Sequence, residues 1–405
     1  MSVSISLIEQ LAKHLMRPID AATRHKARLH LLDWLACVAG ARGSRFRSMS
    51  LRAYHGSEDW LGNVLEMDDV HREGRLHPGP VIWPAALSDA DMDDVLNAAI
   101  IGYEAMISVG ATFDNHHYAY WHPTCTAGVF GAAAAFMADA GPLDTNTLTQ
   151  ALTFAGTTTG GLWQTRHEND DAKQFHIARA IAGGSDAAGV ALRGLRGPRF
   201  ILEGPQGLYA ATCRDPNPMV LTEQWRIHEV SFKPWAACRH AHPVIDCALE
   251  LRAVGKLHPP FHVETYADAI AFCDKPDPAS EQAAKFSLQH AVAVIAAGRN
   301  AAPADFTPDA IADLAPLRAQ VTVKEAPEIS ARYPAHFGAR LNGMELVDTR
   351  GDPERPVSES DIISKMRMLA DWGGLDTGEA DRATELALTG NDGGAIGKML
   401  DRWLA

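Results

Sequence analysis

The chain is poor in cysteine, and its few cysteines form no pattern. The six of them, at positions 37, 125, 213, 238, 247 and 273, include no Cys-x-x-Cys pair. In a chain of 405 residues this argues against a disulfide scaffold and favours reduced thiols. The first 20 residues have the pattern of an amphipathic helix and lack the basic start and the cleavage site of a signal peptide. We therefore expect a cytoplasmic protein.

Long apolar runs and an excess of positive charge are also missing. No apolar run reaches the roughly 18 residues that a membrane span needs, so we expect no membrane partner. Lys and Arg number 37 against 50 Asp and Glu, which gives a net charge of -13. Because no local basic stripe offsets this charge, we expect no nucleic-acid partner.

Several common catalytic motifs are absent as well. The sequence has no Gly-x-Gly-x-x-Gly after a strand and no Walker P-loop, so it predicts no nucleotide site. It lacks the Gly-x-Ser-x-Gly elbow, which argues against a serine hydrolase of that type. It also lacks His-Glu-x-x-His and the EF-hand loop, two frequent metal-binding patterns.

The first 230 residues favour closely packed helices. Their apolar residues recur at helical spacing, and many of these positions hold alanine or glycine, which predicts tight contacts between helices with few large side chains. The stretches that carry this pattern are 27–41, 91–113, 126–141, 148–162 and 175–195. In the first of them we expect the helix to end at Gly40.

A mixed α+β segment follows. Strand-like patterns occur in 225–232, 259–273, 318–327 and 339–350, the last with a turn at Asn342-Gly343, and helical patterns occur in 242–254 and 280–298. From residue 358 the chain is helical again. We predict a mainly α fold with a smaller α+β domain. The domains are 1–230, 231–356 and 357–405, the last returning to the helical domain.

The stretch 66–79, EMDDVHREGRLHPG, is dense in reactive side chains. Asp68, Asp69, His71 and His77 are possible metal ligands, but their spacing matches no closed zinc pattern. A site for acid–base chemistry or anion binding, and a solvated loop, are the alternatives. Proline after His77 favours an extended backbone there, so we expect its ring to be held in place, as a proton shuttle needs.

Two later stretches place histidines at the ends of helices. His122 also precedes a proline, and Thr124 or Thr126 is expected to cap the helix that follows. A packed histidine beside a capped helix is the plainer interpretation. Lys173 and His176 are three residues apart, so they share one helix face ahead of an alanine-rich stretch. A surface lysine is the alternative there.

A basic stretch begins at Lys233. Four basic groups lie within ten residues (Lys233, Arg239, His240 and His242), with no acid before Asp246. Such a group suits a carboxylate-rich small molecule, because arginine binds carboxylates bidentately and lysine adds a point charge. A basic surface patch is the alternative. Further on, His290 stands in an apolar helix pattern, where a core role and a functional role are equally compatible with the sequence.

Six stretches, in this order, resemble the MmgE/PrpD family. They are LLDWLACVAGA, EMDDVHREGRLHPG, WHPTCTAGVFGAAAAF, DAKQFHIARAIAGGSDAA, FKPWAACRHAHPVID and AKFSLQHAVAVIAAG, and they span residues 31 to 298. The family includes 2-methylcitrate dehydratase, cis-aconitate decarboxylase and iminodisuccinate epimerase. The resemblance implies an all-helical bundle domain, a smaller α+β lid domain, a homodimer, and no metal or organic cofactor.

The resemblance and the reactive stretches described above together indicate the site residues. We predict catalytic roles for Asp68, His77, His122, Lys173 and Lys233, and substrate binding by Glu66, Asp69, His71, Arg72, His176, Arg239, His240 and His290. No metal ligand is predicted.

Three departures from the family pattern argue against a decarboxylase. Glu66 and Val70 stand where decarboxylase-type members have Asp and Thr, His290 stands near the place of an active-site tyrosine, and the segment from Gly40 to Glu66 is shorter than usual. We therefore expect a cofactor-independent dehydratase of a small di- or tricarboxylic acid, which removes a proton next to a carboxylate. An epimerase of an amino- or imino-dicarboxylate is the alternative, and a non-catalytic carboxylate-binding protein is a third.

Overall fold

The computed structural model describes residues 5–48, 61–168 and 170–405. The contacts within it divide the chain into two compact units. Unit 1 contains the described residues up to 64 together with 69–230 and 359–405, and unit 2 contains 65–68 and 231–358. The predicted shortening between Gly40 and Glu66 falls in large part on residues 49–60, which lie outside the described residues.

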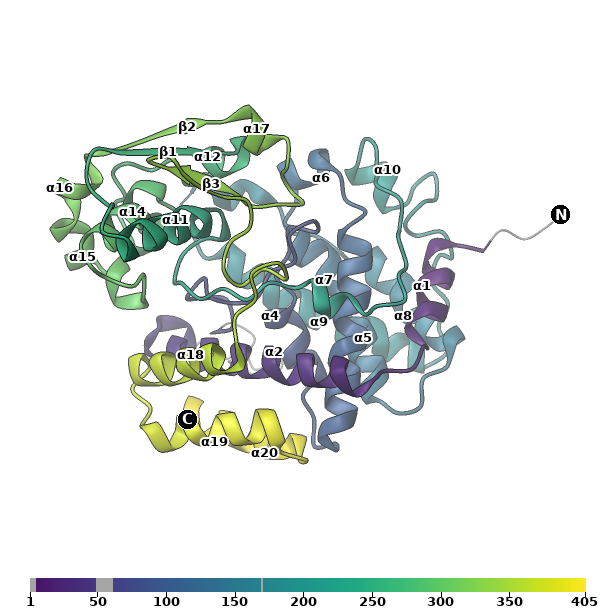
Figure 1. The fold of residues 1–405 in the computed structure, drawn as a ribbon. Helices are drawn as coiled ribbons and strands as arrows, with labels where there is room; N and C mark the ends of the chain where they lie inside the picture. Colours follow the sequence, from purple (N-terminus) through teal and green to yellow (C-terminus); the bar gives the residue numbers. More distant parts are fainter. Residues whose placement is uncertain (1–4, 49–60, 169) are drawn as a thin grey trace. The chain divides into compact units, whose positions relative to one another are not determined.

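Unit 1 is built from helices (Figure 1). Its α-helices are α1 (Leu7–Leu15), α2 (Ala21–Gly40), α4 (Gly79–Ala86), α5 (Met92–Gly110), α6 (Asn115–Tyr120), α7 (Pro123–Asp139), α8 (Thr145–Thr157), α9 (Ala172–Leu192), α10 (Leu208–Thr212), α18 (Glu359–Trp372), α19 (Thr377–Thr389) and α20 (Gly393–Leu404). Short 3-10 turns are η1 (Ala41–Gly43), η2 (Arg45–Ser48), η3 (Trp163–Arg166) and η4 (Arg226–Glu229). The helices predicted before residue 230 are confirmed. No helix in the described ranges combines the length and apolarity needed to cross a bilayer.

Helix α7 lies at the centre of unit 1, where it packs against α4, α5, α8 and α9. Small residues allow this close approach. A Cβ atom added at Gly131 of α7 would lie 2.8 Å from the carbonyl oxygen of Gly102 on α5, and 2.6 Å from the Cβ of Met106. The tight helix contacts predicted from the alanine and glycine content are therefore confirmed.

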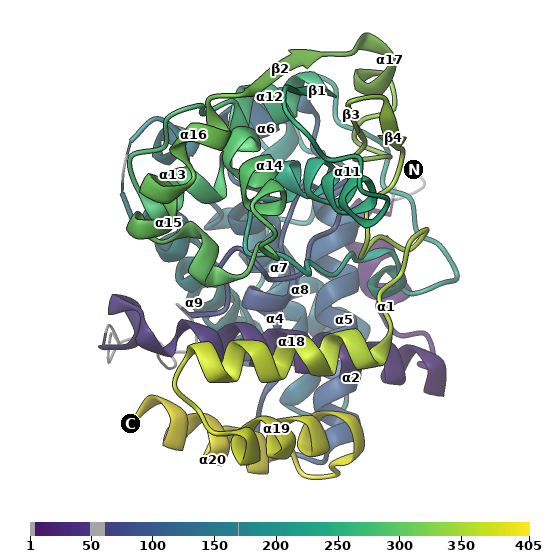
Figure 2. The ribbon, with the colours of Figure 1, turned by 60° about the vertical axis from the view of Figure 1, so that its left-hand side comes forward.

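The C-terminal helices return to the first helices of the same unit. Figure 2 shows α18 running alongside α2, and the two helices are in extensive contact. A buried ion pair joins them, in which Lys365 Nζ donates to Asp33 Oδ1 at 2.6 Å. Neither side chain is more than 7% exposed, so each charge depends on its partner for its solvation.

Replacing Lys365 with Met should lower the free energy of unfolding by about 3 kcal/mol, because it leaves Asp33 buried without that partner. The matched control is Arg367→Met on the same helix. Its ion pair with Asp381 is more than half exposed on both sides and should be worth less than about 1 kcal/mol. Urea denaturation of both variants tests the difference, and equal losses would contradict it.

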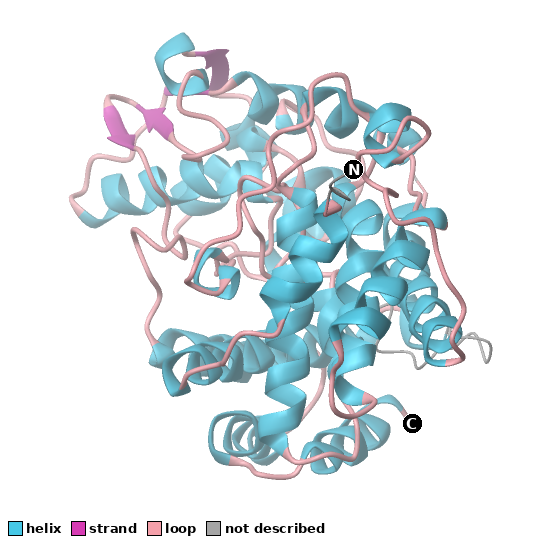
Figure 3. Ribbon diagram, turned by 90° about the vertical axis from the view of Figure 1, so that its right-hand side faces the viewer, coloured by secondary structure: helices cyan, strands magenta, loops and turns pink. Residues whose placement is uncertain are grey.

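Unit 2 contains the strands of the described chain (Figure 3). They form one four-stranded sheet of order β2-β1-β3-β4, with β1 (Phe261–Thr265), β2 (Val321–Glu325), β3 (Ala339–Leu341) and β4 (Met344–Leu346). β1 pairs in parallel with β2 and antiparallel with β3, and β3 pairs antiparallel with β4. The helical elements are η5 (Arg239–Ala241), α11 (His242–Ala253), α12 (Ala267–Cys273), α13 (Glu281–Lys285), α14 (Leu288–Ala296), η6 (Pro303–Phe306), α15 (Pro308–Asp313), α16 (Ala315–Arg318) and α17 (Pro327–Ser330). The predicted fold class, mainly α with a smaller α+β part, is confirmed.

The last predicted strand is a hairpin of two strands. Asn342 and Gly343 connect β3 to β4, and both have positive φ, 47° and 88°. A two-residue turn of this kind has the twist that antiparallel strands require, and Asn-Gly is the pair that adopts it most readily. The turn predicted at this position is confirmed.

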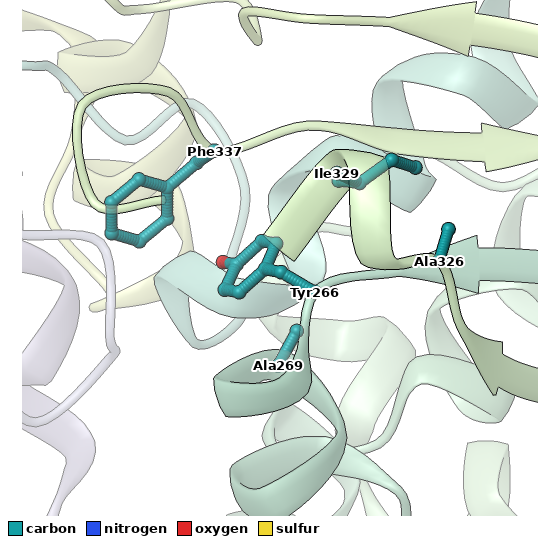
Figure 4. Packing of buried hydrophobic residues seen from close by; sticks show 5 residues of the cluster. All are labelled: Tyr266, Ala269, Ala326, Ile329 and Phe337. Atoms are coloured by element: carbon teal, nitrogen blue, oxygen red, sulfur yellow. The ribbon is translucent and has the colours of Figure 1, made fainter. Parts of the chain in front are cut away.

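An apolar cluster packs beside the sheet in unit 2 (Figure 4). It consists of Tyr266, Ala269, Ala326, Ile329 and Phe337, all at most 4% exposed. The cluster joins the end of β1 and the start of α12 to α17, so it fixes the loops that follow the strands.

Three sequence predictions of secondary structure are wrong in whole or in part. The strand-like pattern of 259–273 gives β1 only, and Ala267–Cys273 form the helix α12. Residues 225–232 form no strand, because Arg226 N donates to the buried carboxylate of Glu104, and the chain turns through η4 instead. The helix predicted over 280–298 is interrupted. The side chain of Ser287 accepts from His290 N and caps a new helix, α14, after α13 has ended.

Candidate active site

The acidic stretch 66–79 is buried rather than solvated. Glu66, Asp68, Asp69 and His71 are each at most 3% exposed. Buried carboxylates are expensive unless donors or cations satisfy them. The structure therefore excludes the solvated-loop interpretation for these residues.

His77 is held in one orientation, as its position before proline predicts. Its Nδ1 lies 3.0 Å from the carbonyl oxygen of Asp69, and its backbone N donates to Thr124 Oγ1 at 3.1 Å. A carbonyl oxygen only accepts, so Nδ1 carries the proton in this contact. The lone pair then lies on Nε2, which is the arrangement that a general base requires.

The helix cap predicted for Thr124 or Thr126 is wrong. His122 occupies the N-cap position of α7, and no side chain caps that helix. Thr124 uses its hydroxyl for the backbone of His77, while Thr126 donates to the carbonyl oxygen of His122 at 2.8 Å. The two threonines therefore tie the two His-Pro turns to α7.

Basic side chains gather around His122 in unit 1. Its Nδ1 lies 3.2 Å from Nδ1 of His176. Burial holds the pKa of His122 well below its ordinary value, and the neighbouring basic groups of His176, Lys173, His77 and Arg166 lower that pKa further. We call these five residues the histidine cluster. Since burial also lowers the pKa of His176, both rings of the contact are uncharged at neutral pH.

Two residues near His122 were not predicted. The ring of Trp163 lies 4.2 Å from the ring of His122, and the guanidinium of Arg166 lies 4.0 Å above Trp163 and 4.7 Å from the ring of Tyr118. Both belong to η3, in the polar stretch just before Lys173. An arginine close to a tryptophan in a polar stretch could have indicated an anion site, because a guanidinium stacked on an aromatic ring is held in place for binding an anion.

Unit 2 holds a second basic group, centred on Lys233. This side chain is fully buried, and its Nζ lies 3.7 Å from Oε2 of Glu66, too far for a hydrogen bond. No described residue accepts a hydrogen bond from it. Glu66 has a positive φ of 57°, which costs a non-glycine residue about 1–3 kcal/mol. Such strain is concentrated at functional sites, and a buried ammonium with open donors suits an anionic ligand.

Arg239 adds further donors in the same unit. Its Nη2 donates to Asp352, which also accepts from Ser231. Its Nε and Nη1 are buried, and no described residue accepts from them. The guanidinium is thus anchored on one side and keeps donors for a carboxylate on another.

Several predicted substrate contacts already have protein partners. His71 binds Glu229 through Nε2 and Gly74 N through Nδ1. His290 is fully buried, with Nε2 2.8 Å from the carbonyl oxygen of Asp305, so the structure supports the core interpretation for it.

His240 and Asp69 are likewise committed to the protein. His240 Nδ1 contacts the Tyr266 hydroxyl at 2.8 Å, and its ring stacks on Phe272. The carboxylate of Asp69 accepts from Gly79 N and from Tyr103. These contacts give His71, His290, His240 and Asp69 a structural or positioning role, and the substrate contacts predicted for them stay predictions. The roles predicted for the buried Asp68 and the half-buried Arg72 stay predictions.

None of the predicted site residues belongs to the one group that could hold a metal among the described residues. That group is His336, Asp348 and Glu354 of unit 2, whose ligand atoms lie within 4.8 Å of one another. His336 already pairs with Asp348 at 2.7 Å, and Glu354 is exposed. The group has the features of an ordinary surface ion pair.

The arrangement supports two operations. In unit 1, His77 presents an oriented base in the histidine cluster, which also contains Lys173 and Arg166. In unit 2, Lys233 and Arg239 offer buried donors to an anion. These are the groups needed to bind carboxylates and to remove a weakly acidic proton beside one.

Comparison with known proteins shows the family of the chain. The MmgE/PrpD N-terminal domain matches residues 60–220 and the MmgE/PrpD C-terminal domain matches residues 235–389. Cis-aconitate decarboxylase from Homo sapiens is 27% identical over 182 residues, and the Mus musculus protein of the same name is 27% identical over 183 residues. Each match covers 42% of this chain and 37% of the relative's length. Together the two domain matches cover most of the sequence, so the chain belongs to the MmgE/PrpD family.

Proposed function

We propose that the protein is a lyase that dehydrates a small di- or tricarboxylic acid by removing a proton next to a carboxylate. The observation that carries this proposal is the orientation of His77. Its Nδ1 contacts the carbonyl oxygen of Asp69, which places the proton on Nδ1 and the lone pair on Nε2, the atom that we propose acts as the base. Membership of the MmgE/PrpD family supports a lyase-type reaction.

The proton balance of a dehydration needs one base. His77 Nε2 takes the proton from carbon, and the electron pair of the C–H bond stays on that carbon as a carbanion next to the carboxylate. This electron pair then forms the new C=C bond as the β-hydroxyl leaves. The hydroxyl departs as water with the proton that His77 has taken, so His77 ends each turnover neutral. No redox step and no added co-reactant is involved.

Positive charge has to stabilise the intermediate. Charge develops on the carboxylate next to the carbanion, and fixed cations in a poorly solvated site stabilise it strongly. Lys173 and Arg166 supply these cations in unit 1. In unit 2, Lys233 and Arg239 have the chemistry to bind a carboxylate as well, through donors that no described residue occupies.

The pKa of His122 favours dehydration over the epimerase alternative. Epimerisation returns the proton to the opposite face of the carbon, which calls for a second, protonated acid. Burial and the surrounding positive charges hold the pKa of His122 well below its ordinary value. This histidine is therefore uncharged at neutral pH and suits hydrogen bonding to the developing charge better than proton donation.

Proton NMR in D2O with a panel of acids tests the proposed function. The panel contains 2-methylcitrate, citrate, cis-aconitate and iminodisuccinate. New olefinic signals from a hydroxy acid, or loss of the olefinic signal of cis-aconitate by hydration, support the proposal. Loss of a C–H signal with the carbon skeleton unchanged and no olefinic signal from any acid would instead identify an epimerase. Thermal stabilisation by these acids without any conversion would identify a binding protein.

A further inference from the structure

The buried side of the His-Pro-Gly turn connects His77 to a tyrosine on another helix. The backbone carbonyl of Asp69 accepts from His77 Nδ1 at 3.0 Å, and the carboxylate Oδ1 of the same residue accepts from Gly79 N at 2.8 Å. Oδ2 accepts from the hydroxyl of Tyr103 at 2.6 Å. Asp69 is therefore bonded to both ends of the turn and to α5, all within unit 1.

Tyr103 is itself firmly held. It is fully buried on α5, and its ring lies edge-on to Trp83 of α4 at 6.1 Å. Burial, with the nearby carboxylate of Asp69, raises the pKa of Tyr103 well above its ordinary value, so the hydroxyl stays protonated and donates. Tyr103 thus contacts both α4, the helix that follows the turn, and Asp69, the residue that binds the turn.

The carboxylate of Asp69 also has neighbours on α2. His30 Nδ1 lies 2.8 Å from Oδ2, but burial holds the pKa of His30 well below its ordinary value, so this ring is uncharged at neutral pH. Lys26 is the nearby cation. Burial lowers its pKa to about 8, although Asp69 and Asp33 act to raise that pKa. A short hydrogen bond to a buried carboxylate, such as that from Tyr103 to Oδ2, is strong and holds the carboxylate in one orientation.

We propose that Tyr103 is a positioning residue that acts on His77 through Asp69. The inference rests on the proposed function, because it assigns Tyr103 the task of fixing the base of that reaction. Without the hydroxyl, Asp69 loses a donor at Oδ2, and the backbone carbonyl that fixes the ring of His77 is free to shift. Displacing a catalytic group by about 1 Å costs as much as a hundredfold in rate.

Tyr103→Phe tests this role, because it removes only the hydroxyl. Tyr209→Phe is the matched control. Tyr209 is a buried tyrosine of the same unit, on α10, with Thr112 and Cys213 as its neighbours. Both variants are compared with the unmodified protein by melting temperature, by kcat and KM, and by 15N NMR of the histidine rings. The His77 signal is assigned by its loss in His77→Asn.

The proposal predicts that Tyr103→Phe lowers kcat about ten- to a hundredfold with KM unchanged, and that His77 loses its uniform Nδ1-protonated form. Tyr209→Phe should change neither. A His77 signal that is unaltered in folded Tyr103→Phe would overturn the proposal. Because the NMR signal requires no substrate, it decides the role of Tyr103 even if no acid is turned over, an outcome that would count against the proposed function alone.

Discussion

Replacing Lys173 with Met is expected to lower kcat/KM by about a thousandfold while the protein stays folded. The lysine lies in the histidine cluster, where its charge contributes to the low pKa of His122. A cation fixed in that position stabilises a carboxylate that gains charge as the proton leaves, and methionine keeps the length of the side chain without the charge. Steady-state kinetics measure kcat/KM, and a melting curve shows whether the variant stays folded.

The matched control for Lys173 is Lys398→Met. Lys398 is an exposed lysine of unit 1, on α20, so the substitution removes the same charge from the net balance of the protein. This variant should retain full activity. Near-normal turnover by Lys173→Met would contradict the role of the cation. Equal losses of activity in both variants would mean that the net charge of the protein, and not the position of Lys173, causes the effect.

His77→Asn is expected to lower kcat by about a hundred- to ten-thousandfold. The amide nitrogen of asparagine occupies nearly the place of Nδ1, so this variant can still donate to the carbonyl oxygen of Asp69. It lacks any group at the place of Nε2, the atom that we propose takes the proton. The substitution therefore removes the base while it keeps the hydrogen bond that holds the His-Pro-Gly turn.

Two further variants sharpen the test of His77. His77→Gln places its amide nitrogen near the position of Nε2 and cannot act as a base, so it should be as inactive as His77→Asn. His25→Asn makes the same replacement at an exposed histidine of α2 and should leave kcat unchanged. Measurable kcat in His77→Asn within a few-fold of the unmodified protein would exclude His77 as the base.

The sequence predicted the helices of unit 1 well, because their signal is local. Runs such as 91–113 contain enough apolar residues to define a buried helix without knowledge of its neighbours. The strand expected over 225–232 failed for the opposite reason. The conformation of this segment depends on the carboxylate of Glu104, more than 100 residues earlier. That carboxylate accepts the hydrogen bond from Arg226 N that the backbone of a neighbouring strand would otherwise accept.

The candidate site shows the same contrast. The position of His77 before a proline was enough to predict a fixed ring, because proline restricts the backbone of the residue before it. Asp69 and His71 were predicted as substrate contacts because the sequence shows acidic and basic residues but not their hydrogen-bond partners in the fold. Those partners, Tyr103 and Glu229, come from distant parts of the chain. Trp163 and Arg166 were missed although they lie in the polar stretch just before Lys173, because their contact with His122 depends on the fold.

The most direct test of the central claim is deuterium uptake at the carbon next to the reacting carboxylate. Proton NMR in D2O follows this exchange in the unmodified protein, in Lys398→Met, in Lys173→Met and in His77→Asn, with the acid that the panel identifies. The account predicts exchange in the first two proteins and none in the other two, since the cluster of unit 1 breaks the C–H bond. Exchange that persists in His77→Asn, or conversion by release of CO2 with that C–H bond intact, would contradict it.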